Sequence, residues 1–127
     1  MRRVFELTRG SGKTVDEQII HAFGANEAGG LFPYAPVVFN RRGDMFGATL
    51  EGGSASCECG TIFGMKQEAG GKWGFEVLHR FVGTDGSDPQ YGMTLDSKGN
   101  LYGTTKNGGP YSGGVVFELS PTAQASK

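Results

Sequence analysis

The chain has 127 residues, a length within the range of one ordinary domain with a single hydrophobic core. Glycine accounts for 23 of them and hydrophobic types for 37%, a composition that favours tight turns between short strands and argues against long helices and membrane spans. The formal net charge is -1 and the basic residues are scattered, so nucleic acid is not an expected partner.

Short runs rich in β-branched and aromatic residues recur along the chain, each bounded by Gly, Asn, Asp or Pro. This pattern is typical of β-strands. We predict an all-β chain with no helix longer than two turns between residues 30 and 119. The strands are expected at residues 4–7, 18–23, 36–40, 44–49, 60–65, 75–81, 92–96, 100–105 and 114–119.

These runs belong to an internal repeat, in which proline and glycine positions and three apolar segments match. Pro33 aligns with Pro89, Gly43 with Gly99, Gly47 with Gly103, residues 60–65 with 114–119, residues 19–23 with 77–81, and residues 3–7 again with 115–119. Self-similarity of this kind indicates copies of one supersecondary unit.

Two equivalent loops, residues 40–44 and 96–100, join consecutive strands of the two copies. Both contain a glycine, and hairpin turns commonly need one residue with a positive φ. Glycine adopts this conformation freely, whereas a side chain costs roughly 1 kcal/mol or more. We therefore predict that Gly43 and Gly99 both have positive φ.

Four short antiparallel strands per copy are typical of a β-propeller blade. The expected architecture is about two propeller-type repeats in residues 1–119, followed by a flexible tail over residues 120–127. Two repeats cannot close a propeller, which typically has four to eight blades. Either the chain is a fragment of a longer gene, or copies self-associate into a closed ring.

The simplest ring is a homotrimer with about six blades. Residues 18–23, a strand without a partner in its own chain, would complete the last blade of a neighbour. Residues 4–7 duplicate a strand of that blade, so they would be displaced or would pair at the outside.

One stretch resembles a known bacterial family. Residues 100–105, followed by residues 107–109 and 114–119, are similar to the tandem repeat named GloVer, whereas residues 45–49 and the loop at 57–59 depart from it. The resemblance implies the repeat fold and little about activity. The family is often secreted or attached to the cell surface, yet no signal peptide is evident at the N-terminus, so localisation stays open.

Residues 10–14, Gly-Ser-Gly-Lys-Thr, look like part of a phosphate-binding loop. That motif needs a further glycine where Leu7 stands, and it needs a helix afterwards. A mobile hairpin loop is the favoured interpretation.

Cys57 and Cys59 are weak metal candidates, because two thiols need further ligands. A disulfide or free loop thiols are the alternatives. His21 and His79 occupy the same repeat position and are expected to be structural parts of a strand.

Candidate ligand-binding residues lie in the loops of the second copy: Asp85, Asp88, Tyr91, Asn107 and Tyr111. Asp85 and Asp88 offer enough oxygen to begin a calcium site but fewer than the roughly six to eight ligands that calcium takes. A solvated turn without a cofactor is therefore favoured, and calcium is the alternative. The rings of Tyr91, Tyr111 and Trp73 lie near loops, where they can line a binding surface. Phe46 and Tyr102 occupy equivalent strand positions and are expected to pack between sheets.

No serine-nucleophile elbow or zinc-protease motif occurs. The favoured function is a ligand-binding or structural repeat module that recognises a carbohydrate or surface polymer without turnover. The alternative is a hydrolase, similar to a lactonase or esterase, with its site in the central funnel of an assembled propeller.

Overall fold

The computed structural model describes residues 2–10, 12, 14–24 and 27–120. The predicted tail therefore lies outside the described residues, apart from Ser120. The Ser120 hydroxyl donates a hydrogen bond of 2.7 Å to Oδ1 of Asn100, which ties this residue to the body of the protein.

The protein is all-β, and the only helical segments in the described residues are two short 3₁₀ turns. This confirms the predicted all-β class, and a strand lies in each of the predicted ranges, although only two residues are strand in the ranges 36–40 and 92–96. In chain order the elements are β1 (Arg2–Arg9), β2 (Val15–Phe23), η1 (Glu27–Gly29), β3 (Leu31–Pro33), β4 (Val38–Phe39), β5 (Met45–Glu51), β6 (Thr61–Gln67), η2 (Ala69–Gly71), β7 (Trp73–Arg80), β8 (Thr94–Leu95), β9 (Leu101–Thr105) and β10 (Val115–Leu119).

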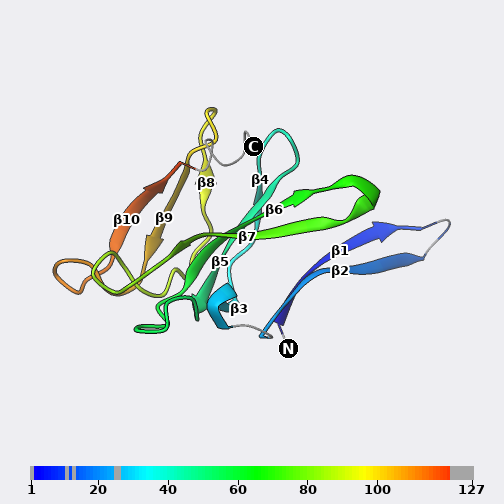
Figure 1. The fold of residues 1–127 in the computed structure, drawn as a ribbon. Helices are drawn as coiled ribbons and strands as arrows, with labels where there is room; N and C mark the ends of the chain where they lie inside the picture. The colour runs from blue at the N-terminus through cyan, green and yellow to red at the C-terminus, as the bar shows by residue number, and fades with distance from the viewer. Residues whose placement is uncertain (1, 11, 13, 25–26, 121–127) are drawn as a thin grey trace.

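The strands form three sheets that lie side by side (Figure 1). β1 pairs with β2, and β8, β9 and β10 form a second sheet in that order. The central sheet has the order β3-β5-β6-β7, with β4 also paired to β5. All pairs between these strands are antiparallel, so one repeat becomes the meander β4-β5-β6-β7 and the next becomes β8-β9-β10.

The prediction that residues 18–23 lack a partner strand in their own chain is wrong. β2 pairs with β1 from Phe23 opposite Arg2 to Val15 opposite Arg9, so β1 is neither displaced nor outside a sheet. The backbone N–H of Gly10 donates to the carbonyl of Thr14 at 2.9 Å. A short loop closes at little entropic cost, which favours this local hairpin. Residues 10–14 therefore connect the antiparallel strands β1 and β2, as expected for a hairpin loop. Residues 11 and 13 of this loop are not among the described residues.

The equivalent strands β5 and β9 carry the same kind of threonine hydrogen bonds. The hydroxyl of Thr49 donates to the carbonyl of Glu51 at 3.0 Å and accepts from the N–H of Thr61 at 3.1 Å. In the second copy Thr105 donates to the carbonyl of Asn107 at 2.9 Å and accepts from the N–H of Val115 at 3.1 Å. The sequence repeat is therefore a repeat of three-dimensional structure.

The two hairpin loops also share one geometry. Gly43 and Gly99 have φ of 86° and 88°, which confirms the prediction. Oδ1 of Asn40 accepts from the N–H groups of Arg42 and Asp44 at 3.0 and 2.9 Å. Its amide donates to Oδ2 of Asp44 at 3.1 Å.

In the second loop the amide and carboxylate are exchanged. Oδ1 of Asp96 accepts from the N–H groups of Lys98 and Asn100, both at 2.9 Å, and Oδ2 accepts from the Asn100 side chain at 2.9 Å. The Tyr102 hydroxyl also donates to Oδ2 of Asp96 at 3.0 Å. Side-chain caps of this kind fix a turn that would otherwise be loose.

These hydrogen bonds predict an acid-sensitive loop. The Asn100 side chain first, then its backbone N–H, lowers the pKa of Asp96 to about 2. A carboxylate with a depressed folded-state pKa stabilises the fold above its unfolded value of about 4, and this stabilisation is lost as the pH falls toward 2. We expect the urea midpoint to fall over that interval and Asp96→Asn to reduce the fall. An equally steep fall in the variant would contradict this assignment.

Two clusters of buried apolar side chains hold the three sheets together. The first joins the β1–β2 hairpin to the central sheet, and the second joins the central sheet to β8–β10. Equivalent ring pairs mark both interfaces: Phe23 and Phe63 at 5.2 Å, and Phe81 and Phe117 at 5.4 Å between centroids. The first cluster contains Val4, Phe23, Met45, Phe63 and Met65; the second contains Phe46, Ala48, Cys59, Ile62, Phe81, Met93 and Leu101.

Candidate functional site

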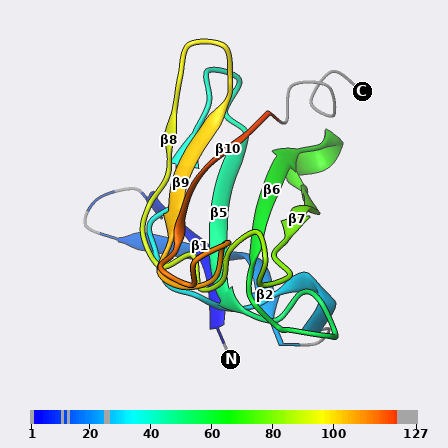
Figure 2. The ribbon, with the colours of Figure 1, turned by 90° about the vertical axis from the view of Figure 1, so that its left-hand side faces the viewer.

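A groove of about 520 Å³ lies between the two equivalent hairpin loops. Figure 2 shows these loops side by side at one end of the sheets, one between β4 and β5 and the other between β8 and β9. The groove is lined by Phe39, Asn40, Arg41, Arg42, Phe46, Leu95, Asp96, Ser97, Lys98 and Gly99. Residues far apart in the sequence therefore form one surface.

The capping groups of both loops hold the groove in shape. Asn40 and Asp96 use their side chains within their own turns, so they act as the frame. The pKa of Tyr102 is raised to about 12, first by its hydrogen bond to Asp96 and then by that to Glu118. Its hydroxyl shares one proton between these two carboxylates. The Asp96 loop thus remains one hydrogen-bonded unit at neutral pH.

The groups that face outward are basic or aromatic. Arg41, Arg42 and Lys98 are exposed, and the ring of Phe39 is 57% exposed. Guanidinium and ammonium groups donate hydrogen bonds to anions and hydroxyls. An exposed ring offers a flat apolar surface beside them. This arrangement can bind a polar ligand that has carboxylates and one apolar face.

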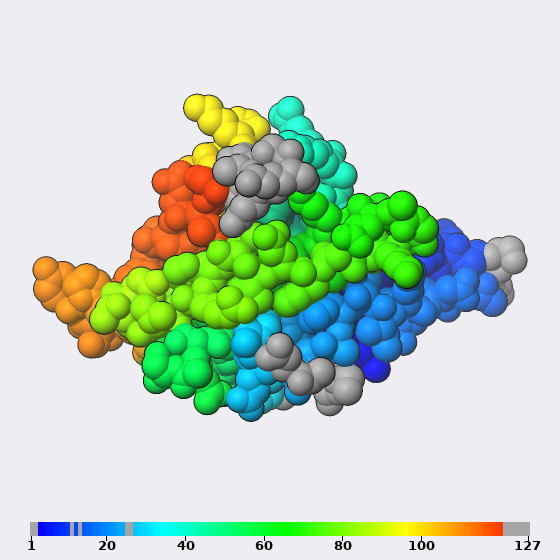
Figure 3. Space-filling view, in the orientation of Figure 1, coloured from blue at the N-terminus to red at the C-terminus, as the bar shows by residue number. Residues whose placement is uncertain are grey.

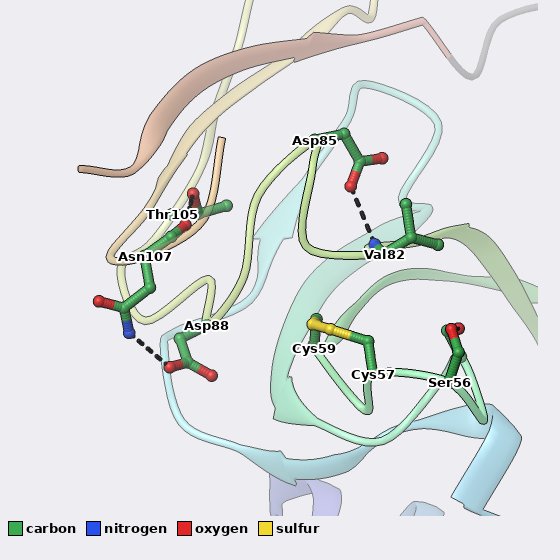
Figure 4. The surroundings of a disulfide bond; sticks show 9 residues. Ser56, Cys57, Cys59, Val82, Asp85, Asp88, Thr105 and Asn107 are labelled. Carbon is green, nitrogen blue, oxygen red and sulfur yellow. Dashed lines mark hydrogen bonds between the residues drawn. A yellow bond between two sulfur atoms is a disulfide. The ribbon is translucent and has the colours of Figure 1, made fainter. Parts of the chain in front are cut away.

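Of the predicted binding residues, the structure brings Asp88 and Asn107 together (Figure 4). The Asn107 amide donates to Oδ2 of Asp88 at 2.8 Å. The backbone of Ser87 pairs with that of Asn107, and the N–H of Asp88 donates to the carbonyl of Cys59 at 2.9 Å. These contacts lie beyond the end of β9, whereas the groove lies before its start.

Asp85 makes different contacts in the same region. Its Oδ1 accepts from the N–H of Val82 at 2.9 Å, and its Oδ2 lies 2.8 Å from Nε2 of His79 (Figure 4 shows the Val82 bond). The His79 ring also meets Phe81 edge-on, with centroids 4.7 Å apart. Asp85 therefore connects the end of β7 to the following loop.

The aromatic predictions have mixed outcomes. Tyr91 and Tyr111 are 61% and 94% exposed, and ligand binding by them and by Asp85, Asp88 and Asn107 stays a prediction. Phe46 is buried in the second cluster as expected. The prediction for Tyr102 is wrong, because its ring is 36% exposed and no sheet of the described residues covers it. Trp73 is partly buried against the first cluster.

Cys57 and Cys59 are joined in a disulfide, with Cα atoms 5.1 Å apart (Figure 4). Cys59 is buried in the second cluster, and Cys57 packs against it. The disulfide occupies both thiols, so they are not metal ligands in this state. Within the described part of the chain, no group of three or more His, Cys, Asp or Glu side chains is arranged to hold a metal ion.

His21 and His79 occupy equivalent places near the ends of β2 and β7, as predicted. The His21 ring stacks on Phe75 with centroids 3.8 Å apart and nearly parallel planes, and burial lowers the pKa of His21. His21 is therefore part of the packing between the hairpin and the central sheet.

The basic groove is the feature that sequence reasoning missed. In the sequence its basic residues belong to a set that is scattered along the chain. The available signal was position, because Arg42 and Lys98 occupy the same place in the two aligned loops. The groove could be recognised only from the structure, in which the hairpin loops of consecutive repeats lie side by side.

The antiparallel meanders, the repeated loops and the two equivalent interfaces define a β-rich tandem-repeat protein. The family model described as Gloeobacter/Verrucomicrobia repeat matches residues 3–127, and the chain belongs to this family. No curated protein and no solved structure matches the chain. No helix among the described residues is long and apolar enough to cross a membrane.

Proposed function

We propose that this chain is a ligand-binding repeat module that recognises an acidic carbohydrate or a similar surface polymer in the groove between its hairpin loops. The observation that carries this proposal is the groove itself, which combines three basic side chains with an exposed aromatic ring. Residues 1–119 act as the module.

The chemistry of a sugar chain fits these groups. A pyranose ring presents C–H groups on one face, which pack on an aromatic ring such as that of Phe39. Carboxylates of a uronate accept charge-assisted hydrogen bonds from Arg41 and Lys98. The composition argues against nucleic acid, so a polyuronate is favoured over a polynucleotide.

Replacing a basic groove residue should weaken binding. We expect Arg41→Ala and Lys98→Ala each to raise the Kd for a polyuronate oligosaccharide about tenfold, because each removes a hydrogen bond to a charged group. Calorimetric titration measures this change. Lys106→Ala, an exposed lysine beyond the other end of β9, should leave the Kd unchanged.

Titrations with a neutral polysaccharide and with duplex DNA test the ligand class. Tighter binding to DNA than to the polyuronate, or equal effects in all three variants, would contradict the assignment of the groove.

The proposed architecture is a propeller in which the three sheets act as blades or parts of blades. Support comes from the four-strand meander and from the contact between β4 and β8, the equivalent first strands of neighbouring repeats. Closure into a ring would come from self-association of copies of this module. The stoichiometry of three chains stays a prediction.

A hydrolase is the second candidate, supported by the pair of His79 and Asp85. A carboxylate at 2.8 Å from a histidine nitrogen can orient the ring as a general base. Purified protein should be incubated with ester, lactone and glycoside substrates, with and without EDTA. Turnover that His79→Asn abolishes would favour the hydrolase over a binding module without turnover.

A further inference from the structure

The two interfaces between the three sheets are equivalent. At each interface, one face of a sheet packs against the opposite face of the next sheet. At the first, Val4 of β1 belongs to one buried cluster with Phe63 and Met65 of β6. At the second, Ile62 of β6, the residue that aligns with Val4, is buried where Phe117 and Leu119 of β10 pack. Phe117 and Leu119 align with Phe63 and Met65. The same face positions therefore meet twice within the chain.

On the β1–β2 hairpin, the face equivalent to that of Phe63 and Met65 is exposed to solvent. Phe5 and Leu7 of β1 align with Phe63 and Met65, which are each 1% exposed, yet they are themselves 52% and 59% exposed. Ile19, which lies opposite Phe5 on β2, is 47% exposed. We call the side chains of Phe5, Leu7, Val15 and Ile19 the head face.

Strand β10 carries the complementary face, also uncovered. Val116 aligns with Val4 and Ile62, which are 8% and 0% exposed, whereas Val116 is 81% exposed. Its partner across the sheet is Thr104, and Tyr102 lies opposite Glu118 on the same side. We call Tyr102, Thr104, Val116 and Glu118 the tail face. In Figure 3 the hairpin and β10 lie at opposite sides of the molecule.

We propose that the tail face of one copy of this chain packs on the head face of a second copy, which forms the same sheet interface a third time. This inference rests on the proposed function as a propeller-type module. It adds that the partner is a second copy of the chain, and it names the residues of the contact. It needs no exchange of strands, so β1 and β2 stay paired as the structure has them. The head face gathers four exposed apolar side chains, and exposed apolar surface of this kind typically marks an interaction site.

Both faces also carry charged side chains. The pairing register places Arg9 and Glu17 on the same side of the hairpin as Leu7, and Glu118 lies on the tail face. The contact joins different surfaces, so repetition produces a closed ring or an open filament rather than an isologous dimer.

The first test measures the mass of the full chain by light scattering over a range of concentrations. Wild-type protein should form oligomers. Leu7→Asp and Val116→Asp should each be folded monomers, because each places a charge in one of the two faces. Tyr34→Asp, at a loop residue that is 73% exposed, is the matched control and should assemble as the wild type does.

Mixing the two interface variants tests the head-to-tail arrangement. Leu7→Asp retains an intact tail face, and Val116→Asp retains an intact head face. An equimolar mixture should therefore form a heterodimer and nothing larger. A mixture that stays monomeric while the wild type assembles would overturn the proposal, as would a wild-type chain that is monomeric at every concentration.

Circular dichroism and titration with the polyuronate on the same samples separate the two proposals. A variant that has lost its native spectrum is replaced by Leu7→Ser or Val116→Ser, which must then show the same loss of assembly. Folded monomers that keep the wild-type Kd per groove would confirm that assembly and binding are separate properties. Wild-type protein that assembles but does not bind polyuronate would contradict the proposed ligand, while the proposed contact between head and tail faces would still hold.

Discussion

Replacing Phe63 with alanine should lower the free energy of unfolding by about 3–5 kcal/mol. Phe63 is 1% exposed, and its ring centroid lies 5.2 Å from that of Phe23 and 5.6 Å from that of Phe75. It lies opposite Gly47, which has no side chain with which to fill the space. The truncation therefore leaves a cavity between the hairpin and the central sheet. Equilibrium unfolding in urea measures the loss.

Tyr34→Ala is the control for this substitution. The Tyr34 ring is 73% exposed, so the free energy of unfolding of this variant should stay within about 0.5 kcal/mol of the wild-type value. Hydrogen exchange should locate the effect of Phe63→Ala, with amides of β1 and β2 losing more protection than those of β9. A loss below about 1 kcal/mol would show that the hairpin is not held by this cluster.

Gly60→Ala should destabilise the protein by about 2–4 kcal/mol, through backbone strain and overpacking together. Gly60 has φ of 100°. A Cβ here would lie 2.5 Å from the carbonyl oxygen of Thr49, 2.8 Å from that of Leu50 and 2.7 Å from Cδ of Pro89. None of these atoms belongs to a flexible side chain that can move aside. The urea midpoint and the melting temperature should both fall.

Gly43→Ala separates the two causes. Gly43 has φ of 86°, yet a Cβ at this position would meet no atom within 4 Å. The free energy of unfolding of Gly43→Ala should therefore fall only by the conformational cost of about 1 kcal/mol. Equal losses at both positions would mean that close approach of the backbone contributes nothing at Gly60.

The strands and turns were predictable because their signals are local. Alternating apolar residues define the strands, and Gly43 and Gly99 sit where a turn needs a positive φ. The pairing of β2 was not predicted, since repeat logic assigned it to a neighbour although the nearest partner, β1, is joined to it by a short loop. Tyr102 aligns with Phe46, but only the sheet of Phe46 has a further sheet packed on that face.

The candidate site was only partly predictable for a related reason. Asp88 and Asn107 lie in loops that the repeat marks, and they do meet. The groove depends on the spacing between consecutive repeats, which no run of residues encodes by itself. Its basic residues occupy ordinary turn positions and carry no motif of their own.

The two hairpin loops exchange the positions of their amide and carboxylate and keep the same contact between them. One loop has Asn40 facing Asp44, and the other has Asp96 facing Asn100. An ancestor with either arrangement reaches the other only by two substitutions, and each single-step intermediate has two carboxylates or two amides face to face. The two positions therefore work as a matched pair in each loop, because two carboxylates face to face would repel each other.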